Sequence, residues 1–447
     1  MFKQLLYSIS FYFSRLFYII AACIIALFCI AYFFPPLIEI GYIAALCLAM
    51  LVVIDIFVSY AGRKPITATR QCSERFSNGD ENKVALHITN HRTYKTKLTV
   101  IDEIPVQFQE RNWQRILMVD GNNTVLVEYN LRPLERGEYE FGIINLLVYS
   151  PLGMVVRHVK AGEPKTVAVY PSFMQMRCYQ LLAVANQLQE GGSRPLRKIG
   201  RSLEFEQIRE YVPGDDYRNI NWQATARKSS LMMNTFMDER SQQVVCLIDK
   251  GRTMKMPFEG MALLDYAINA TLVLSNIVLL KQDKAGLLTF SKHIDQYVPA
   301  DKKSTQLSLL LETLYHQQTS FTDSDFEALY TTVRYRIKQR SLLILFTNFE
   351  SMYGLERQLP FLKQLSAHHA LLVVFFENTE LFELQQQPAV TLEQVYDKAI
   401  ANKFALEKKQ MVKELQKHGI MALLTAPQKL TANTINRYLE IKARQVV

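Results

Sequence analysis

Two long uncharged runs near the N-terminus place the strongest constraint on how this chain can fold. Residues 16–38 carry no charged side chain, and residues 40–61 carry only Asp55. A helix needs about 20 apolar residues to cross the hydrocarbon core of a bilayer, so each run is long enough to do so. Pro35, Pro36 and Glu39 lie between the runs and predict a tight turn. The sequence therefore predicts a two-helix transmembrane hairpin within residues 1–65, with the lipid bilayer as its partner.

The basic residues around these runs predict how the hairpin is oriented. Lys3 and Arg15 precede the first run, Arg63 and Lys64 follow the second run, and the turn contains none. Positive side chains accumulate on the cytoplasmic side of membrane helices, so residues 66–447 are expected in the cytoplasm. The chain would then be a multi-pass protein of the inner (cytoplasmic) membrane. A cleaved signal peptide is the rival interpretation of the first run. It is disfavoured because a second apolar run follows and a small-residue cleavage site does not.

Asp55 is the one charged side chain within the second run. It precedes Arg63 and Lys64 by about two helical turns, so we expect it near the lipid headgroups. A functional role inside the membrane is the alternative interpretation.

Composition narrows the classes of protein to which the chain can belong. Its 447 residues are enough for two or three folded units. The net charge is +9, but no dense run of Lys and Arg with interleaved aromatic residues occurs, which disfavours nucleic-acid binding. The six cysteines include no C-x-x-C pair. They indicate neither a disulfide framework nor a zinc site, and they fit a reducing compartment.

The periodicity of the chain changes from period two to an alternation of strands and helices. Residues 66–170 alternate apolar and polar side chains between turn signals, which predicts an antiparallel β-sandwich. Residues 171–240 look like a connector that begins with a helix over 172–190. From residue 241 onward, continuous apolar runs at 341–349 and 370–378 alternate with helical runs. Such runs are typical of strands covered on both faces, so residues 241–447 are predicted to form an α/β domain with a mostly parallel sheet.

The connector contains the densest group of candidate functional side chains. The run YVPGDDYRNINWQATAR occupies residues 211–227, after a charged run at 204–210 that looks helical. Pro213 and Gly214 predict a turn, and Asp215 would cap the helix that follows it. A plain solvated loop is the alternative. The candidate binding or structural residues are Gly214, Asp215, Asp216, Arg218, Trp222 and Arg227.

Two roles could explain this group of residues. They could attach the connector to the α/β domain through charge-assisted hydrogen bonds, or they could present Trp and Arg anchors to a partner protein. Attachment is the favoured interpretation, because the acids and arginines can satisfy one another within a few residues. Acid–base chemistry by Asp215 and Asp216 is disfavoured, since adjacent side chains diverge.

The run at 211–227, followed by a strand that ends at Asp249, resembles the signature of the domain-of-unknown-function fifty-eight family, often described as MoxR-associated membrane proteins. The run RGEYEFGIINLLVYSPLGM at 136–154 extends the resemblance upstream. The resemblance implies two N-terminal membrane helices, a β-rich domain, a domain similar to von Willebrand factor type A, and a MoxR-type AAA+ ATPase as partner.

Domains of the von Willebrand type A class carry a metal motif, Asp-x-Ser-x-Ser, completed by a later Thr and an Asp. Here the first piece reads Asp249-Lys-Gly251-Arg-Thr253, Thr322 is the candidate for the later Thr, and Asn348 stands where the Asp is expected. One carboxylate and two hydroxyls form a poor cage for Mg²⁺, which prefers several oxygen ligands. We therefore expect a degenerate loop and no cofactor, with magnesium held by Asp249, Thr253 and Thr322 as the alternative.

Known catalytic motifs give little support for an enzyme. The chain contains no phosphate-binding loop and no metalloprotease or serine-hydrolase motif. We therefore expect a non-enzymatic, membrane-anchored interaction or adaptor module that works with the ATPase in protein assembly or remodelling. A metal-dependent ligand-binding domain and an unrecognised membrane-associated hydrolase are the alternatives.

Overall fold

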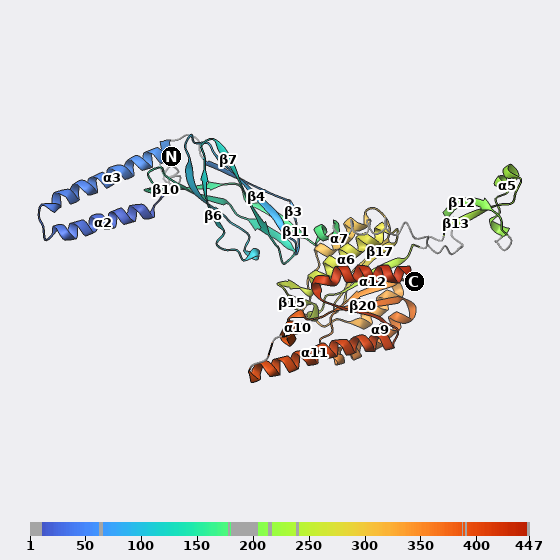
Figure 1. Cartoon of the computed structure of the whole chain (residues 1–447). Helices are drawn as coiled ribbons and strands as arrows, with labels where there is room; N and C mark the ends of the chain where they lie inside the picture. Colours follow the sequence, from blue (N-terminus) through green and yellow to red (C-terminus); the bar gives the residue numbers. More distant parts are fainter. Residues whose placement is uncertain are drawn as a thin grey trace. The chain divides into compact units, whose positions relative to one another are not determined.

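The computed structural model describes residues 11–61, 66–177, 179, 204–212, 217–237, 241–386, 388 and 391–444. The chain divides into two compact units, Met1–Tyr170 and Pro171–Val447. Figure 1 shows the helical pair and the β-sheets of the first unit, and the α/β body of the second.

Two apolar helices, α2 (Arg15–Ala31) and α3 (Leu37–Ala61), pack against each other as a hairpin in the first unit. Ser14 caps α2, because its side-chain oxygen accepts a hydrogen bond from the Phe17 amide at 3.4 Å. Large apolar side chains are exposed along both helices, including Ile19, Ile25, Leu46 and Phe57. The predicted helical pair is therefore confirmed, and its apolar surface is not covered by the described protein.

Among the described residues, two helices are long and apolar enough to cross a membrane. One is α3, over Leu37–Tyr60, and it is mostly exposed. The other is α6 (Leu263–Leu280), which lies mostly buried in the second unit and so has the character of a core helix. The apolar helix α2 is shorter, at 17 residues.

The rest of the first unit consists of several mainly antiparallel sheets around one core. Their orders are β1-β10-β9-β5-β6, β3-β11-β8 and β2-β4-β7. The strands are β1 (Phe11–Phe13), β2 (Ile66–Cys72), β3 (Arg75–Ser77), β4 (Asn82–Asn90), β5 (Thr96–Asp102), β6 (Gln114–Val119), β7 (Asn123–Leu131), β8 (Gly137–Phe141), β9 (Ile144–Tyr149), β10 (Val155–Ala161) and β11 (Lys165–Tyr170). Buried side chains from all three sheets, such as Leu86, Leu98 and Val167, form one hydrophobic cluster. We call this part the β domain.

Asp55 joins the end of α3 to the β domain through contacts that the sequence did not predict, while its position near the lipid headgroups stays a prediction. Its carboxylate is fully buried and accepts a hydrogen bond from the Ser150 hydroxyl. It also accepts hydrogen bonds from the backbone amides of Leu152, Met154 and Val155 at 3.3, 3.0 and 3.1 Å. Four hydrogen-bond donors therefore satisfy the oxygens of this buried side chain.

Two arginines of the β domain fix the last turn of the same helix. Arg92 and Arg157 each donate to the Ser59 carbonyl at 3.2 Å. Cations near a helix C-terminus interact favourably with its unpaired carbonyls. The last turns of α3 therefore contact the β domain through a defined set of polar side chains.

The second unit contains a small antiparallel hairpin made of β12 (Glu204–Glu210) and β13 (Met232–Met237), with helix α5 (Trp222–Lys228) between the two strands. We call its described residues, 204–212 and 217–237, the arm. The helix-like prediction for 204–210 is wrong, because this segment pairs with β13 as a strand. Of the helix predicted over 172–190, the described residues 173–177 are helical and the remainder lies almost wholly outside the described residues.

The body of the second unit is a six-stranded sheet with the order β18-β17-β14-β19-β20-β21. All neighbouring pairs are parallel except β17 and β18, so the predicted mostly parallel sheet is confirmed. The strands are β14 (Gln243–Asp249), β17 (Lys284–Phe290), β18 (Ile294–Asp301), β19 (Leu342–Phe346), β20 (Ala370–Phe376) and β21 (Met421–Thr425).

Helices cover both faces of this sheet, as continuous apolar strands require. One face packs against α6 (Leu263–Leu280), α7 (Gln306–Tyr315) and α12 (Leu430–Ala443), and the other against α8 (Phe326–Arg336), α9 (Met352–His368) and α11 (Leu392–Lys417). Further elements include the two-residue strands β15 (Pro257–Phe258) and β16 (Met261–Ala262) and the helix α10 (Thr379–Gln386). Figure 1 shows α6 and α12 beside one another and α9 near α11.

Candidate functional site

The carboxyl edge of a parallel sheet is where ligands commonly bind, and here it contains Asp249. Asp249 ends β14 and Thr347 follows β19, and because these strands are parallel and adjacent, both residues lie at the same edge. The Thr347 hydroxyl donates to Asp249 Oδ2 at 2.6 Å, and the Gly251 amide donates to Oδ1 at 2.8 Å. The Ser324 hydroxyl also donates to Oδ1. Three segments of the chain therefore meet at one carboxylate.

The environment of Asp249 has opposing effects on its acidity. The residue is 2% exposed, and this burial raises the pKa of its carboxyl above the ordinary value. The hydrogen bonds from Ser324, Thr347 and Gly251 lower the pKa and offset part of that increase. The geometry is that of an internal junction, in which both carboxylate oxygens already have partners.

Gly251 stands where the metal motif has a serine, and the structure explains why a glycine fits there. A Cβ atom at this position would collide with the Ser324 hydroxyl. The hydroxyl that the motif lacks is thus supplied by Ser324, which comes from the segment before α8. Sequence reasoning missed Ser324, although the polar run Thr322-Asp-Ser-Asp325 marked the segment.

The later hydroxyl predicted at Thr322 does not reach Asp249. Thr322 Oγ1 lies 2.5 Å from Ser320 Oγ, and the Thr322 carbonyl accepts a hydrogen bond from the Arg252 amide at 3.1 Å. Ser324, two residues further along the chain, makes the contact instead. Thr253 is half-buried and lines a cavity of about 210 Å³ next to Asp249.

Charged side chains of both signs surround this cavity. Arg252 lies 4.0 Å from both Asp323 and Glu350, and Arg357 lies 3.9 Å from Asp323. All four side chains are well exposed, and exposed ion pairs of this kind stabilise a fold by about 1 kcal/mol or less. The cavity wall is therefore close to electrically balanced.

Lys408 of α11 occupies the neighbouring strand end. Its ammonium group donates to Asn348 Oδ1 at 2.7 Å and to the Phe349 carbonyl at 2.5 Å. Burial lowers the pKa of Lys408 to about 8, although Glu350 acts in the opposite direction. Lys408 carried no signal in the sequence, because it reaches the site from a helix that begins far along the chain.

The side chains at this edge do not fit a divalent metal. Within the described part of the chain, no three His, Cys, Asp or Glu residues are grouped so that they could hold an ion. The Asp249 oxygens accept hydrogen bonds from Ser324 and Thr347, and the residue at the expected carboxylate position, Asn348, accepts from a lysine. A hard cation such as Mg²⁺ needs several oxygen ligands, and this set offers one carboxylate that is already engaged.

The signature stretch forms a separate candidate site on the arm. Gly214, Asp215 and Asp216 lie outside the described residues. Helix α5 is capped by Asn221, whose side-chain oxygen accepts from the Ala224 amide at 3.0 Å. The Asn221 amide group also donates to Asn234 Oδ1 at 2.8 Å, which ties the start of α5 to β13.

The aromatic residues of the arm are exposed. Trp222 is 70% exposed and Tyr217 is 69% exposed, and the Arg218 guanidinium lies 5.9 Å from the centre of the Tyr217 ring. Arg227 lies in the last turn of α5. The attachment of the connector to the α/β domain by these residues stays a prediction.

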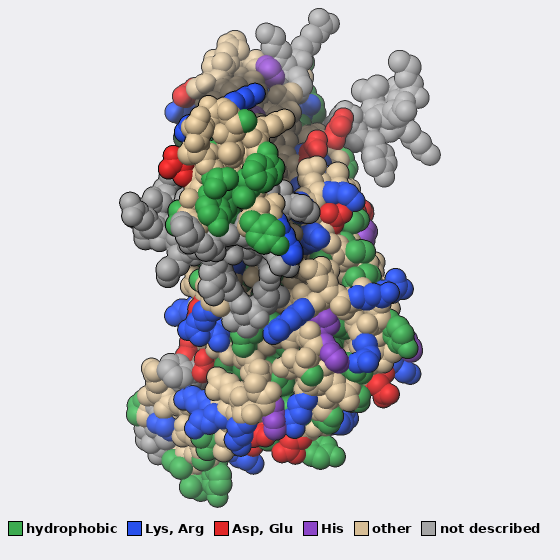
Figure 2. Space-filling model, turned by 90° about the vertical axis from the view of Figure 1, so that its right-hand side faces the viewer, with side chains coloured by type: hydrophobic (Ala, Val, Ile, Leu, Met, Phe, Trp, Pro, Cys, Tyr) green, Lys and Arg blue, Asp and Glu red, His purple; other side chains and the backbone are tan. Residues whose placement is uncertain are grey.

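The charged surface shows no single basic stripe on the face drawn in Figure 2. Lys and Arg side chains there form several separate groups, with acidic side chains between them.

Comparison with known proteins confirms the resemblance predicted from the signature stretch, over part of the chain. Residues 207–417 match the family model described as "Protein of unknown function DUF58". The chain is also similar to the "Uncharacterized protein YeaD" of Bacillus subtilis, with 25% identity over 207 residues. That alignment covers 43% of this chain and 52% of YeaD, so the chain spans about half the length of this relative.

Two solved structures each resemble part of the chain at low similarity. The conserved hypothetical protein BatB from Bacteroides thetaiotaomicron matches 45% of this chain and 98% of its own, at 12% identity and a TM-score of 0.31. The CARDB domain of the PF1109 protein from Pyrococcus furiosus matches 24% of this chain and 94% of its own, at 13% identity and a TM-score of 0.18. Neither score is high enough to assign a fold.

Proposed function

We propose that this chain, whose residues 207–417 match the DUF58 family, is a membrane-anchored, non-enzymatic interaction or adaptor module. It would work with a MoxR-type AAA+ ATPase on the cytoplasmic side of the membrane, in the assembly or remodelling of other proteins. The family resemblance motivates the choice of partner, and the surface of the arm supports a role in protein binding.

The exposed aromatic surface of the arm carries this proposal. Trp222 and Tyr217 are exposed on a hairpin of two short strands, together with the apolar side chains of Ile208, Val212 and Leu231. Tryptophan and tyrosine are the residues that most often dominate the binding energy of protein interfaces. An exposed apolar group of this kind, next to arginines, is the expected form of a docking surface.

The α/β domain would serve as a protein-binding domain similar to von Willebrand factor type A. Its parallel sheet with helices on both faces, and the position of Asp249 at the carboxyl edge of β14, support this assignment. Because Asp249 is satisfied by Ser324, Thr347 and Gly251, we assign it the role of holding three loops together. In this proposal, those loops present a surface whose shape is fixed without a metal.

The helical hairpin would anchor the chain in the inner membrane. Its apolar side chains face outward, and each helix is close to the length that a bilayer requires. The basic residues at the outer ends of the hairpin support a cytoplasmic position for the β domain, the arm and the α/β domain.

Co-purification from native membranes tests the role of the arm. Tagged full-length chain would be solubilised in detergent, and the ATPase that accompanies it would be identified by mass spectrometry. Trp222→Ala should reduce the recovered ATPase at least about tenfold, the loss expected for a dominant interface aromatic. Tyr335→Ala is the matched control, since Tyr335 is a comparably exposed aromatic on α8. Equal recovery with Trp222→Ala and wild type would refute the arm as the docking surface.

A further inference from the structure

A second pocket lies at the opposite edge of the parallel sheet from Asp249. It is formed where α8 and α9 end, just before β19 and β20 begin, and its volume is about 420 Å³. The described residues that line it include no Asp or Glu. Its polar lining residues include Arg334, Lys338, Arg340, Gln364, His368 and His369.

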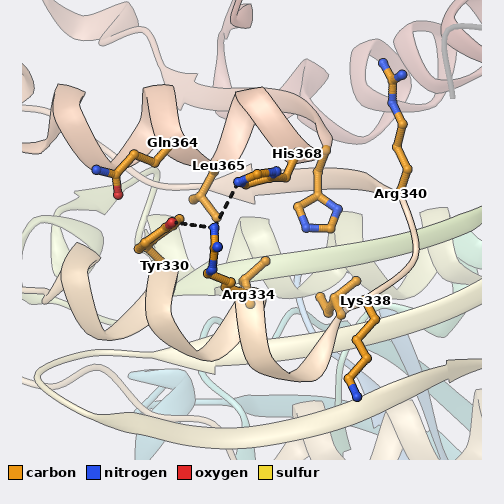
Figure 3. A pocket seen from close by; sticks show the side chains of 10 residues that line it. Tyr330, Arg334, Lys338, Arg340, Gln364, Leu365 and His368 are labelled. Carbon is orange, nitrogen blue, oxygen red and sulfur yellow. Dashed lines mark hydrogen bonds between the residues drawn. The ribbon is translucent and has the colours of Figure 1, made fainter.

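Arg334 contacts two side chains in this pocket that cannot carry a negative charge near neutral pH. One guanidinium nitrogen donates to the Tyr330 hydroxyl at 3.1 Å and lies 3.0 Å from His368 Nε2. Figure 3 shows Arg334 between these two side chains, while Lys338 and Arg340 extend in opposite directions from the segment after α8. Neither partner supplies a negative charge, so the pocket keeps its positive character.

His369 provides an independent sign of a ligand. The side chain is 5% exposed and lines the pocket, and its Nδ1 atom has no hydrogen-bond partner among the described residues. Buried polar atoms nearly always have a partner, so an orphaned one beside a pocket points to a group that binds there.

Helix ends alone do not explain this arrangement. Cations are favourable near helix C-termini, which accounts for Arg334 in the last turn of α8 and His368 in the last turn of α9. Lys338 and Arg340 lie beyond the end of α8. His369 is the C-cap residue of α9, and its backbone amide donates to the Leu365 carbonyl, but this bond leaves its side-chain Nδ1 atom unpartnered.

We propose that this pocket binds a small phosphate-bearing molecule, with Arg334 and His369 as its main contacts and Lys338 as a further cation. Guanidinium groups match the geometry of phosphate oxygens, and the volume falls in the range of small-molecule sites, roughly 300–1,000 Å³. The inference concerns the α/β domain and does not depend on the arm or on an ATPase partner.

Anion binding at this pocket should depend on pH through His369. Burial lowers the pKa of His369, and the neighbouring His368 and Arg340 lower it further. Arg334 and Lys338 from the α8 side, and Tyr330 and Gln364 with no charge, complete the groups that face it. A bound anion favours the protonated imidazole, so affinity should rise as the pH falls.

Calorimetric titration of the full chain in detergent micelles tests this site, with inorganic pyrophosphate as the probe. Wild type should bind, and Arg334→Gln should weaken binding at least about tenfold, the scale of one lost charged hydrogen bond. Lys363→Gln is the matched control, because Lys363 is exposed on α9 and does not line the pocket. Absence of binding by wild type, or equal binding by Arg334→Gln, would overturn the proposal.

Sulfate is the better probe for the pH dependence, because the charge of this anion stays constant between about pH 6 and 8. A change in its affinity over this range therefore reports on the protein. Wild type should bind sulfate more tightly at the lower pH, and His369→Gln should flatten this dependence. A dependence that is unchanged in His369→Gln would contradict the assigned role of His369.

Discussion

Asp249 shows how one substitution in a motif can be compensated from elsewhere in the chain. Gly251 removes both a hydroxyl and the Cβ atom that would block Ser324, and the Ser324 hydroxyl then binds the same carboxylate oxygen as the Gly251 amide. The two residues are therefore coupled, and a change at one should depend on the identity of the other.

Gly251→Ala should destabilise the α/β domain. The new Cβ atom would overlap Ser324, and overpacking in a buried site costs about 1–3 kcal/mol. Adding Ser324→Gly removes the overlapping atoms, so the double variant should lose less than the sum of the single changes. Urea denaturation of the full chain in detergent, followed by far-ultraviolet circular dichroism, measures these differences. Gly354→Ala is the control, since a Cβ there meets only ordinary contacts and alanine favours a helix.

Lys408 should make stability rise with pH on the alkaline side. Its pKa is about 8 in the folded chain and about 10.4 when unfolded. Between those values the unfolded chain binds more protons, so the free energy of unfolding increases as the pH rises, by at most about 3 kcal/mol. Lys408→Met should lack this increase. Parallel pH profiles for wild type and Lys408→Met would show that burial does not lower the pKa of Lys408 in the folded chain.

At the scale of elements, polar contacts join α3 to the turn from β9 to β10 in the first unit. Asp55 binds three backbone amides of this turn, and Arg92 and Arg157 bind the Ser59 carbonyl. Strand β1 continues the same contact, because it pairs with β10 immediately before α2 begins.

Asp55→Asn should loosen this junction. The substitution turns one acceptor oxygen into a donor that faces other donors, at a cost of about 1–3 kcal/mol. Hydrogen exchange of the Met154 and Val155 amides should then accelerate at least about tenfold. Asp120→Asn is the control, because Asp120 forms an exposed ion pair with Lys95 and should leave these amides unchanged. Unchanged exchange in Asp55→Asn would mean that the carboxylate does not hold the turn.

The sequence predicts well those helices and strands whose conformation is determined by the pattern of their own side chains. The apolar helices and the continuous strands of the α/β sheet carry their burial pattern locally, and both are found. The charged run at 204–210 was misjudged as helical because its conformation is set by pairing with β13, about 27 residues away.

The residues of the candidate site also fall into those that the sequence could predict and those that it could not. Asp249, Thr347 and Asn348 could be placed together because parallel strands end at one edge. Ser324 and Lys408 could not be found, because their contacts with Asp249 and Asn348 span 75 and 60 residues of sequence. The contacts of Asp55 could not be predicted for a related reason, since its partners lie 95 to 100 residues away.

At the scale of the whole molecule, the proposal joins an apolar helical hairpin to an arm that exposes Trp222. An ATPase of the AAA+ class needs ATP, so it can meet the arm only if the arm lies in the cytoplasm. The orientation of the hairpin is therefore the condition on which the account depends.

The location of the C-terminus tests this condition most directly. A reporter that is active only in the cytoplasm would be fused after Val447 of the full chain, and the same reporter inserted between Pro35 and Pro36 would mark the turn of the hairpin. The account predicts activity at Val447 and none at the turn, because the basic residues flank the outer ends. An inactive reporter at Val447, with activity from a reporter specific for the outer side, would contradict the account.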